Sequence, residues 1–225
     1  MATRFAIWFL LAMVASVRFG IAQEEPTDQS LRVYGVNIIR DPPQSWTGYG
    51  IYLGRGLVLT AAHVVGSAAR TKPSVRIAGL VLPATAVKEG DFEHVDLTLL
   101  QVDERQLPVS LRLRRMPVCE RPSWVGESVI VVIPEGTARS RIMSPQLLPA
   151  QYRTRFSTVI SDVATTGNSG SGVFDAASKC LLGIMSRKIQ VRPEGADSKS
   201  EYKDLAKYFV PAVTITAFIP NLHHF

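Results

Sequence analysis

The sequence predicts an all-β fold, either an antiparallel barrel or a sandwich. Most apolar runs are short, about four to seven residues, and rich in Val, Ile, Leu and Thr, which is typical of strands. Turn-forming residues divide these runs, as in "DPPQ" at 41–44. The 225 residues are 46% apolar and 20% charged, which is enough apolar material for a globular core.

Two groups of strands are expected, one in each half of the chain. The predicted strands are 33–39, 48–54, 56–65, 75–79, 81–87, 96–102, 127–133, 156–161, 172–175, 180–186 and 208–212. Between the groups, residues 112–124 ("RLRRMPVCERPSW") are rich in breakers and suit a connection between two β halves. The segment 211–222 predicts a short C-terminal helix that begins at Pro211 and stops near Pro220.

The N-terminus has the pattern of a secretory signal peptide. Arg4 precedes an apolar stretch at 5–15, and Ala22 closes a small-residue cleavage pattern. The apolar run is too short to span a bilayer and Arg18 interrupts it, so we expect no stable membrane insertion after cleavage. The sequence therefore predicts a signal peptide at 1–22 and a secreted or periplasmic protein, whose mature chain starts with a loose polar segment at 23–32.

Charge and cysteine content narrow the function classes. The formal charge is +6, and removing residues 1–22 takes away two arginines and no acids, which leaves +4. The basic residues are scattered and do not alternate with aromatic residues, so no nucleic-acid partner is expected. The two cysteines, Cys119 and Cys180, form no CxxC or Cys/His cluster, which argues against a metal site. In an exported chain they favour one disulfide, worth roughly 4 kcal/mol for a loop of about 60 residues.

Three polar side chains stand at the ends of apolar runs: His63 in "VLTAAHVV", Asp96 in "EHVDLTLLQVD" and Ser169 in "TGNSGSG". Each has an ordinary alternative, since a lone histidine is often structural, a buried carboxylate is often paired, and a Gly-Ser stretch is often a turn. Together they suggest acyl transfer. A serine hydroxyl needs an imidazole to take its proton, and the imidazole needs a partner that fixes its tautomer. Glycines beside the serine allow backbone N–H groups to approach an oxyanion.

These motifs resemble those of trypsin-like (chymotrypsin-fold) serine proteases. "LTAAHVV" is similar to the family's histidine motif, "DLTLLQVD" to its aspartate segment and "GNSGSGVF" to its serine motif, in the family's order. "LLGIMSRK" and "YFVPAVTITAFI" resemble the strand after the serine hairpin and the last strand with its helix, so the likeness covers about residues 33–222. The residues around the serine point to the bacterial glutamyl-endopeptidase and HtrA-like branches.

The resemblance implies an architecture of two antiparallel six-stranded β-barrels with a short C-terminal helix. The N-terminal barrel would comprise 33–111, the connection 112–124, and the C-terminal barrel with its helix 125–222. The implied activity is that of a serine endopeptidase that acts on proteins or peptides and needs no cofactor. The oligomeric state stays open, with a monomer as the default expectation.

Carried over by motif, Ser169 would be the nucleophile, His63 the general acid/base and Asp96 its orienting carboxylate. The N–H groups of Gly167 and Ser169 would form the oxyanion hole. Ser186, Arg187 and Lys188 would pair with the substrate backbone as an added strand. The family also has a disulfide in places similar to Cys119 and Cys180.

Other polar residues near the motifs are weaker candidates. Ser171 is a weaker nucleophile candidate because the Gly-Asn-Ser-Gly pattern is centred on Ser169. Among the nearby aspartates, Asp96 is the one that directly precedes the apolar run, unlike Asp91 and Asp103. We interpret His94 as an exposed neighbour, and His223 and His224 as part of a solvated tail. Asn168 stands where trypsins have an aspartate that pairs with a new N-terminal amine, so activation by N-terminal cleavage is not expected.

The resemblance also yields a hypothesis for specificity. The base of the family's pocket lies six residues before the nucleophile, which is Val163 here, and Met185 replaces the histidine that glutamyl endopeptidases use. We therefore expect cleavage after a small or medium apolar residue. An acidic preference is the alternative, because Arg187 and Lys188 supply positive charge. A register slip that brings Asp162 into the pocket would instead favour Lys or Arg.

Two other functions compete with the protease. A catalytically inactive protease fold used for binding is the main alternative, although proteins of that kind usually lose a triad residue and all three are present here. An α/β-hydrolase is disfavoured, because the chain lacks the G-x-S-x-G elbow and its strands do not alternate with long helices. Labelling of Ser169 by a serine-reactive probe separates the enzyme from the binding protein.

Overall fold

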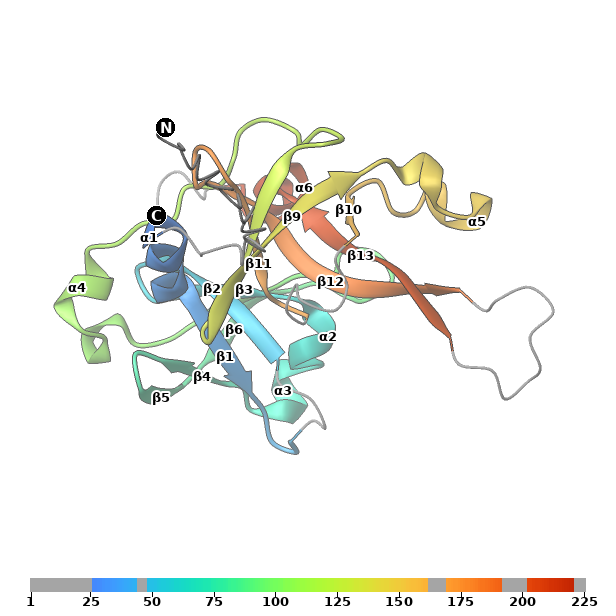
Figure 1. The fold of residues 1–225 in the computed structure, drawn as a ribbon. Coiled ribbons are helices and arrows are strands. Elements are labelled where there is room, and N and C mark those ends of the chain that lie inside the picture. The colour runs from blue at the N-terminus through green and yellow to red at the C-terminus, as the bar shows by residue number, and fades with distance from the viewer. Residues whose placement is uncertain (1–25, 44–47, 162–168, 192–201, 221–225) are drawn as a thin grey trace, which may run out of the picture.

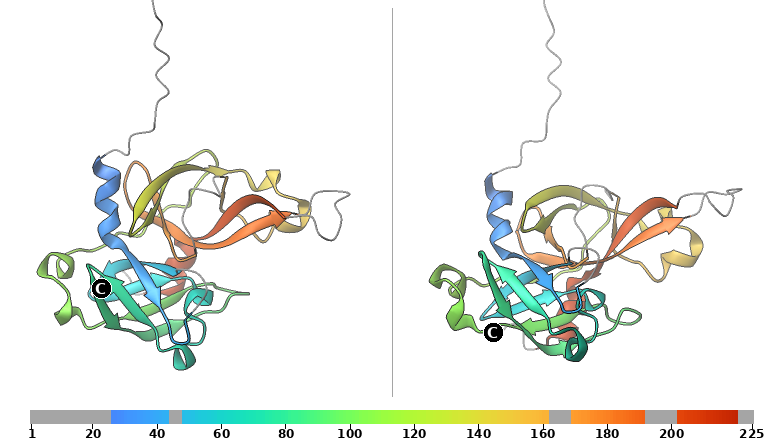
Figure 2. Two further views of the ribbon diagram at one scale, coloured as in Figure 1. Left: turned by 60° about the horizontal axis from the view of Figure 1, so that its bottom comes forward. Right: turned by 90° about the horizontal axis from the view of Figure 1, so that it is seen from below.

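A computed structural model describes residues 26–43, 48–161, 169–191 and 202–220 of the chain. Two β layers are built one after the other along the sequence, and they lie against each other with their buried side chains in one main core (Figures 1 and 2). Short helices connect the strands or flank the two layers. Among the described helices, none has the length and apolar character needed to cross a membrane.

The first layer, the N-terminal sheet, has seven antiparallel strands in the order β5-β4-β1-β2-β3-β7-β6. They are β1 (Gly35–Ile39), β2 (Gly48–Gly54), β3 (Leu57–Thr60), β4 (Ser74–Ile77), β5 (Leu80–Pro83), β6 (Thr85–Glu89) and β7 (Thr98–Gln101). The central strands β2 and β3 are buried along their whole length. Continuous burial explains why their sequences are apolar on both faces.

The N-terminal sheet departs from the expected six-stranded barrel. The run 81–87, expected as one strand, is divided at Pro83, so that β5 pairs with β4 at one edge and β6 pairs with β7 at the other. Because the chain passes from one edge strand to the other within residues 83–85, the sheet must curl until its edges meet at that corner. The described residues contain no ladder between β5 and β6, so the layer is a half-barrel.

The second layer, the C-terminal barrel, is closed by six antiparallel strands in the order β10-β13-β12-β11-β8-β9. They are β8 (Ser128–Ile133), β9 (Gly136–Met143), β10 (Val159–Ile160), β11 (Gly172–Asp175), β12 (Leu181–Val191) and β13 (Lys203–Pro211). The β12–β13 hairpin reaches well beyond the other strands (Figure 1). A mostly β protein with a half-barrel and a closed six-stranded barrel matches the predicted chymotrypsin type of fold.

Short helices complete the fold. They are α1 (Pro26–Gln29), η1 (Ser30–Tyr34), α2 (Ala62–Val65), α3 (Ala68–Thr71), η2 (Glu104–Gln106), α4 (Val109–Arg112), η3 (Pro145–Leu147), α5 (Ala150–Arg153) and α6 (Ala212–Phe218). The C-terminal helix begins after Pro211, as predicted. It crosses back to the N-terminal sheet, where Lys88 Nζ donates to the Phe218 carbonyl at 2.8 Å.

The expected loose segment at 23–32 is helical in its described part, residues 26–32, which corrects the expectation for those residues. Helix α1 and the 3-10 turn η1 occupy residues 26–34. Asp28 is buried there and forms ion pairs with Arg139 at 2.7 Å and with Lys179 at 2.8 Å. These two hydrogen-bonded cations outweigh the effect of burial, which alone would raise the pKa of Asp28, and the net pKa is lowered. The segment is thus fixed to the barrel by long-range charge pairing that its own sequence does not reveal.

A disulfide fixes the connection between the layers to the C-terminal barrel. Cys119 and Cys180 are bonded, with their Cα atoms 5.1 Å apart, which confirms the predicted pairing. The adjoining backbone adds two hydrogen bonds, from Cys119 N to Leu181 O and from Leu181 N to Pro117 O. The connection therefore runs beside the first residue of β12, the strand that continues toward the predicted site.

Candidate active site

Neighbouring strands of the N-terminal sheet bring His63 and Asp96 together. His63 lies in α2, three residues after the end of β3, and Asp96 lies two residues before β7. Since β3 and β7 pair in antiparallel register, with Thr60 opposite Thr98, the end of one strand faces the start of the other. The pairing thus explains how two residues 33 positions apart meet at one edge of the sheet.

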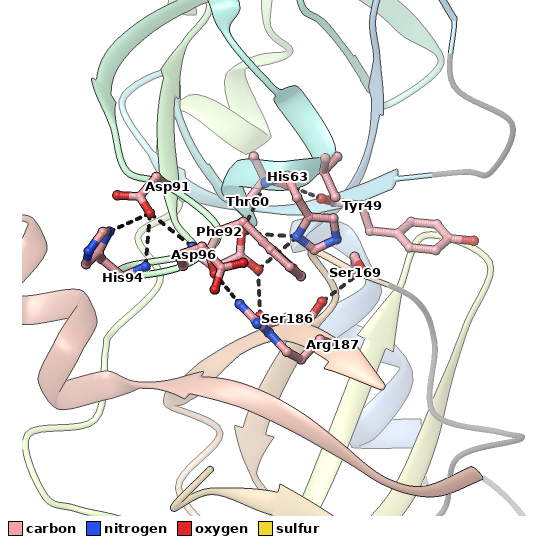
Figure 3. Close-up of polar contacts among 12 residues, drawn as sticks. Tyr49, Thr60, His63, Asp91, Phe92, His94, Asp96, Ser169, Ser186 and Arg187 are labelled. Carbon is pink, nitrogen blue, oxygen red and sulfur yellow. Dashed lines mark hydrogen bonds and ion pairs between the residues drawn. The ribbon is translucent and has the colours of Figure 1, made fainter. Parts of the chain in front are cut away.

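The carboxylate of Asp96 is buried and holds the imidazole of His63 in a fixed orientation (Figure 3). Its Oδ2 lies 2.8 Å from His63 Nδ1, and its Oδ1 accepts from the His63 backbone N–H at 3.0 Å. The side chain of His63 is one-fifth exposed whereas that of Asp96 is 2% exposed. A buried carboxylate on Nδ1 favours the tautomer with a proton on Nδ1, which leaves Nε2 free to accept one.

The main chain of Ser169 is anchored to both layers. Its carbonyl accepts from Tyr49 N in β2 at 3.0 Å, and the N–H of Gly170 donates to Met185 O in β12 at 2.8 Å. The hydroxyl of Thr60 donates a hydrogen bond to the Tyr49 carbonyl at 2.5 Å. Gly170 has φ +88°, and a Cβ there would lie 1.8 Å from Tyr49 O, so this glycine is required for the close approach.

Ser186 connects the three candidate residues. The hydroxyl of Ser169 donates to the Ser186 carbonyl at 3.0 Å, and the Ser186 hydroxyl donates to Asp96 Oδ2 at 2.5 Å. The contacts of the described residues include no bond between the Ser169 hydroxyl and the imidazole of His63. Figure 3 shows this chain of contacts from Ser169 through Ser186 to the Asp96–His63 pair. The geometry offers a hydroxyl, an imidazole and a buried carboxylate at the junction of the two layers.

Comparison with known proteins assigns the family. Residues 48–184, more than half of the chain, match the family described as trypsin-like peptidase domain. The chain belongs to the trypsin-like peptidase family. It is accordingly a serine-type peptidase, a hydrolase of peptide bonds.

Solved structures of trypsin-like peptidases share the fold at low sequence identity. The active form of the Rv3671c protease from M. tuberculosis is 19% identical, with a TM-score of 0.59, over 88% of this chain and 84% of that one. Kallikrein-related peptidase 10 is 17% identical, with a TM-score of 0.61, over 86% and 96% of the two chains. A serine endoprotease from Yersinia pestis is 19% identical, with a TM-score of 0.55, over 89% and 68%. The search of curated proteins found no match.

Some predicted site residues of this trypsin-like peptidase lie outside the described part of the chain. Gly167 and Val163 both fall within 162–168, so the oxyanion hole and the base of the predicted pocket stay predictions. Ser186, Arg187 and Lys188 lie in β12, and Ser186 is the residue of that strand whose carbonyl the Ser169 hydroxyl contacts.

An aromatic ring and a guanidinium, which the sequence motifs do not indicate, cover the His63–Asp96 pair. Phe92 packs edge-on against the imidazole, with ring centroids 5.1 Å apart. The guanidinium of Arg187 lies over the Phe92 ring, 3.7 Å from its centroid, and donates to the Phe92 carbonyl. Burial lowers the pKa of Arg187, against the opposing attraction of Asp96, although a guanidinium stays protonated. A phenylalanine in a polar loop gives no sequence signal for this role.

The weaker candidates lie away from this geometry. His94 is confirmed as an exposed neighbour, with a side chain 82% exposed that pairs with Asp91 at 2.8 Å. Asp103 instead accepts from Arg105 N at the start of η2. Ser171 is fully buried, and His223 and His224 lie outside the described residues. Within the described ranges, no group of three or more His, Cys, Asp or Glu side chains is placed to hold a metal ion.

Proposed function

We propose that this peptidase is an endopeptidase in which Ser169 is the nucleophile, His63 the general acid/base and Asp96 the carboxylate that orients it. The observation that carries the proposal is the Asp96 carboxylate, which is buried, bonded to His63 Nδ1 and joined through Ser186 to Ser169. A buried carboxylate is costly unless it is paired and hydrogen-bonded, as Asp96 is here. An oriented imidazole beside a serine is the arrangement that acyl transfer needs.

In the proposed reaction, the Ser169 hydroxyl leaves the Ser186 carbonyl and turns toward His63 Nε2. His63 takes the proton as Ser169 Oγ attacks the substrate carbonyl, and Asp96 stabilises the imidazolium. His63 then donates that proton to the leaving amine, which produces the acyl-enzyme. Water attacks the acyl-enzyme, again with His63 as base, and releases the product acid.

The open edge of β12 supports a peptide substrate bound as an added strand. Its partner β11 pairs with it only as far as Gly172 opposite Ile184, whereas β13 pairs with β12 to Val191. From Ser186 onward, the edge on the β11 side has no strand partner among the described residues. An extended peptide that pairs there brings its backbone to Ser169, because Ser186 O already contacts the Ser169 hydroxyl.

A binding protein without activity is the second candidate. One observation favours it: the Ser169 hydroxyl donates to Ser186 O instead of His63. A serine held in that rotamer is not activated. Catalytic hydrogen bonds often form only when substrate is bound, so this rotamer is compatible with the enzyme as well.

The decisive experiment is labelling with a fluorophosphonate probe, combined with hydrolysis of an unbiased peptide library. The wild-type protein is expected to be labelled at Ser169 and to cleave peptides. Ser169→Ala should lose labelling and at least about 1,000-fold in rate while remaining folded by circular dichroism. Ser171→Ala is the matched control and should keep its labelling. A folded wild-type protein that neither labels nor cleaves would establish the binding protein instead.

We also propose that the peptidase is exported to the cell exterior or the periplasm. The signal-like pattern at 1–22 and the Cys119–Cys180 disulfide support this proposal, since disulfides persist in oxidising compartments. Expression of the full chain with fractionation of the cells tests it. Mature protein with a new N-terminus near residue 23 is expected outside the cytoplasm, and unprocessed cytoplasmic protein would contradict export.

A further inference from the structure

The loop between β6 and β7 brings an aromatic ring to the proposed base. Within the described residues, the imidazole of His63 makes its polar contact with Asp96 and its aromatic contact with Phe92. The two rings are 5.1 Å apart and inclined at 74°, in the T-shaped arrangement that aromatic pairs favour. A hydrogen bond at Nδ1 alone leaves an imidazole free to tilt about that bond, and the contact with Phe92 restricts this tilt.

The loop itself gives Phe92 little support. Phe92 is 40% exposed, and its neighbours Asp91, Glu93 and His94 are exposed as well. An exposed side chain on an exposed loop keeps much of its rotamer freedom. The ring can therefore order the imidazole only where a group from another segment holds it. That group is Arg187 of β12, in the C-terminal barrel (Figure 3).

The guanidinium of Arg187 contacts both the ring and the backbone of Phe92. It lies over the ring, 3.7 Å from its centroid, and donates to the Phe92 carbonyl. A planar guanidinium can stack on a ring and donate from its edge at the same time, which an ammonium cannot do. The ring centroid of Phe156 lies 5.7 Å from the same guanidinium, so the cation contacts aromatic rings of both layers.

The charge of Arg187 is also tied to the buried acid of the site. Burial lowers the pKa of Arg187, and attraction to Asp96 is the largest opposing influence. The Nε atom of Arg187 lies 3.4 Å from the hydroxyl of Ser186, which in turn donates to Asp96. Arg187 is thus adjacent to both groups that contact the imidazole: it touches Phe92 directly and reaches Asp96 through Ser186.

We propose that Arg187 is a positioning residue, which clamps Phe92 against His63 and so keeps the imidazole in the orientation that Asp96 sets. The inference rests on the proposed function, because it needs His63 as the base. A substrate strand on β12 would pair with the backbone at 186–188, which leaves the Arg187 side chain available for this role. Misplacing a catalytic group by about 1 Å can cost on the order of 100-fold in rate, so loss of the clamp is measurable.

The test measures the rate constant for labelling by a fluorophosphonate probe that carries no peptide. Such a probe reports the activation of Ser169 by His63 and does not depend on binding along β12. Arg187→Met and Phe92→Leu are each expected to be labelled at least about tenfold more slowly than the wild type. Phe92→Tyr retains the ring and should stay within about threefold of the wild type. Labelling of Arg187→Met at the wild-type rate would overturn the inference.

A double variant shows whether Arg187 acts through Phe92. Arg187→Met combined with Phe92→Leu should be labelled no more than about twofold more slowly than Phe92→Leu alone, because both substitutions remove the same contact. Losses that multiply in the double variant would mean that the two residues act independently, which contradicts the clamp.

Arg155 provides a matched control, since it also joins this loop to the C-terminal barrel. It pairs with Glu93 at 2.6 Å, but the two side chains are 50% and 64% exposed. Exposed ion pairs contribute little, so Arg155→Met should be labelled within about twofold of the wild type. An equal loss in Arg155→Met and Arg187→Met would refute a specific role for the stacked guanidinium.

Peptide hydrolysis separates positioning from substrate binding. Loss of the clamp should lower kcat and leave KM within about threefold. A raised KM with unchanged labelling in Arg187→Met would make Arg187 a substrate-binding residue and overturn the inference. All variants are compared as folded protein by circular dichroism, and the exposed position of Phe92 keeps the test valid if Arg187→Met does not fold.

The wild-type protein separates the two levels of the argument. A wild type that is labelled, with variants that are labelled equally fast, overturns the clamp and leaves the proposed endopeptidase intact. A folded wild type that neither reacts with the probe nor cleaves peptides overturns the endopeptidase itself, and the clamp with it.

Discussion

The two layers of the molecule bury charge for different purposes. Among the described residues of the N-terminal sheet, Asp96 is the buried charged side chain, and it binds His63. The C-terminal barrel buries Glu127, Asp175 and Lys207. The two acids pair with Arg121, at 2.6 and 2.9 Å, and that guanidinium also lies over a tryptophan ring.

This comparison separates structural from functional burial. Glu127 and Asp175 meet one strong cation at the end of the interlayer connection, and the hydrogen bonds to Asp175 outweigh burial so that its pKa is lowered. Lys207 shows the opposite balance, because burial and a like charge dominate its pKa. The two acids of the barrel are thus held by a cation that stabilises the fold, whereas the buried acid of the N-terminal sheet orients the proposed base, His63.

The largest expected effect concerns the buried acid of the N-terminal sheet. Asp96→Asn should lower kcat by about 10,000-fold, because an amide offers one acceptor oxygen to the three groups that now bond to the carboxylate and no longer fixes the tautomer of His63. Asp91→Asn, which changes an exposed carboxylate paired to His94, is the control and should retain activity. Steady-state kinetics on one peptide measures both, and a loss below tenfold for Asp96→Asn would remove this residue from the mechanism.

The second prediction concerns the covalent link between the connection and the barrel. Replacing Cys119 and Cys180 by serine should lower the free energy of unfolding by about 4 kcal/mol, because the unfolded chain gains the freedom of a loop of about 60 residues. Urea denaturation at pH 7 of the double variant and of the oxidised wild type measures the difference. A loss below about 1 kcal/mol would show that the noncovalent contacts of the connection already suffice.

The smallest expected effect is a pH dependence that arises from Lys207 in the C-terminal barrel. Lys207 has a pKa lowered to about 8, so it is charged at pH 7 and loses its proton as the pH rises through that value. The charged groups that influence it are Lys188 across the ladder and Asp204 on its own strand. Because this pKa is lower in the folded protein than the ordinary value of 10.5, the unfolded chain binds more protons between about pH 8 and 10.5, so the free energy of unfolding should rise with pH in that window. Urea denaturation at pH 7, 8, 9 and 10 measures this, and a free energy of unfolding that falls between pH 8 and 10 would contradict it.

Much of the strand pattern could be predicted from the sequence because strands that are buried on one or both faces consist largely of apolar residues. Residues 48–54 coincide with β2, which is buried throughout. Strand β9 was missed, because Arg139 and Arg141 alternate with Ser140 and Ile142 on an outward-facing barrel strand and read as polar. The motif "LLGIMSRK" carries the expected strand to residue 188, and the last residues of β12, 189–191, have no sequence signal because this outer part of the strand is only partly buried.

The candidate site was predictable where a motif is local and unpredictable where packing is long-range. His63, Asp96 and Ser169 each stand in a recognisable stretch, and the fold brings them to one junction. The hydroxyl of Ser186 on Asp96 and the ring of Phe92 on His63 depend on contacts between distant segments. The burial of Lys207 depends on β10 and β12 flanking β13, which a single strand's sequence does not encode.

The hydrogen bond from Tyr49 N to Ser169 O makes the position of the proposed nucleophile depend on the folding of both layers. The backbone at Ser169 and Gly170 is bonded to β2 of one layer and to β12 of the other, while His63 belongs to the first layer alone. A chain with one folded layer has no anchored Ser169 beside His63, so the proposed endopeptidase activity requires both layers to be folded.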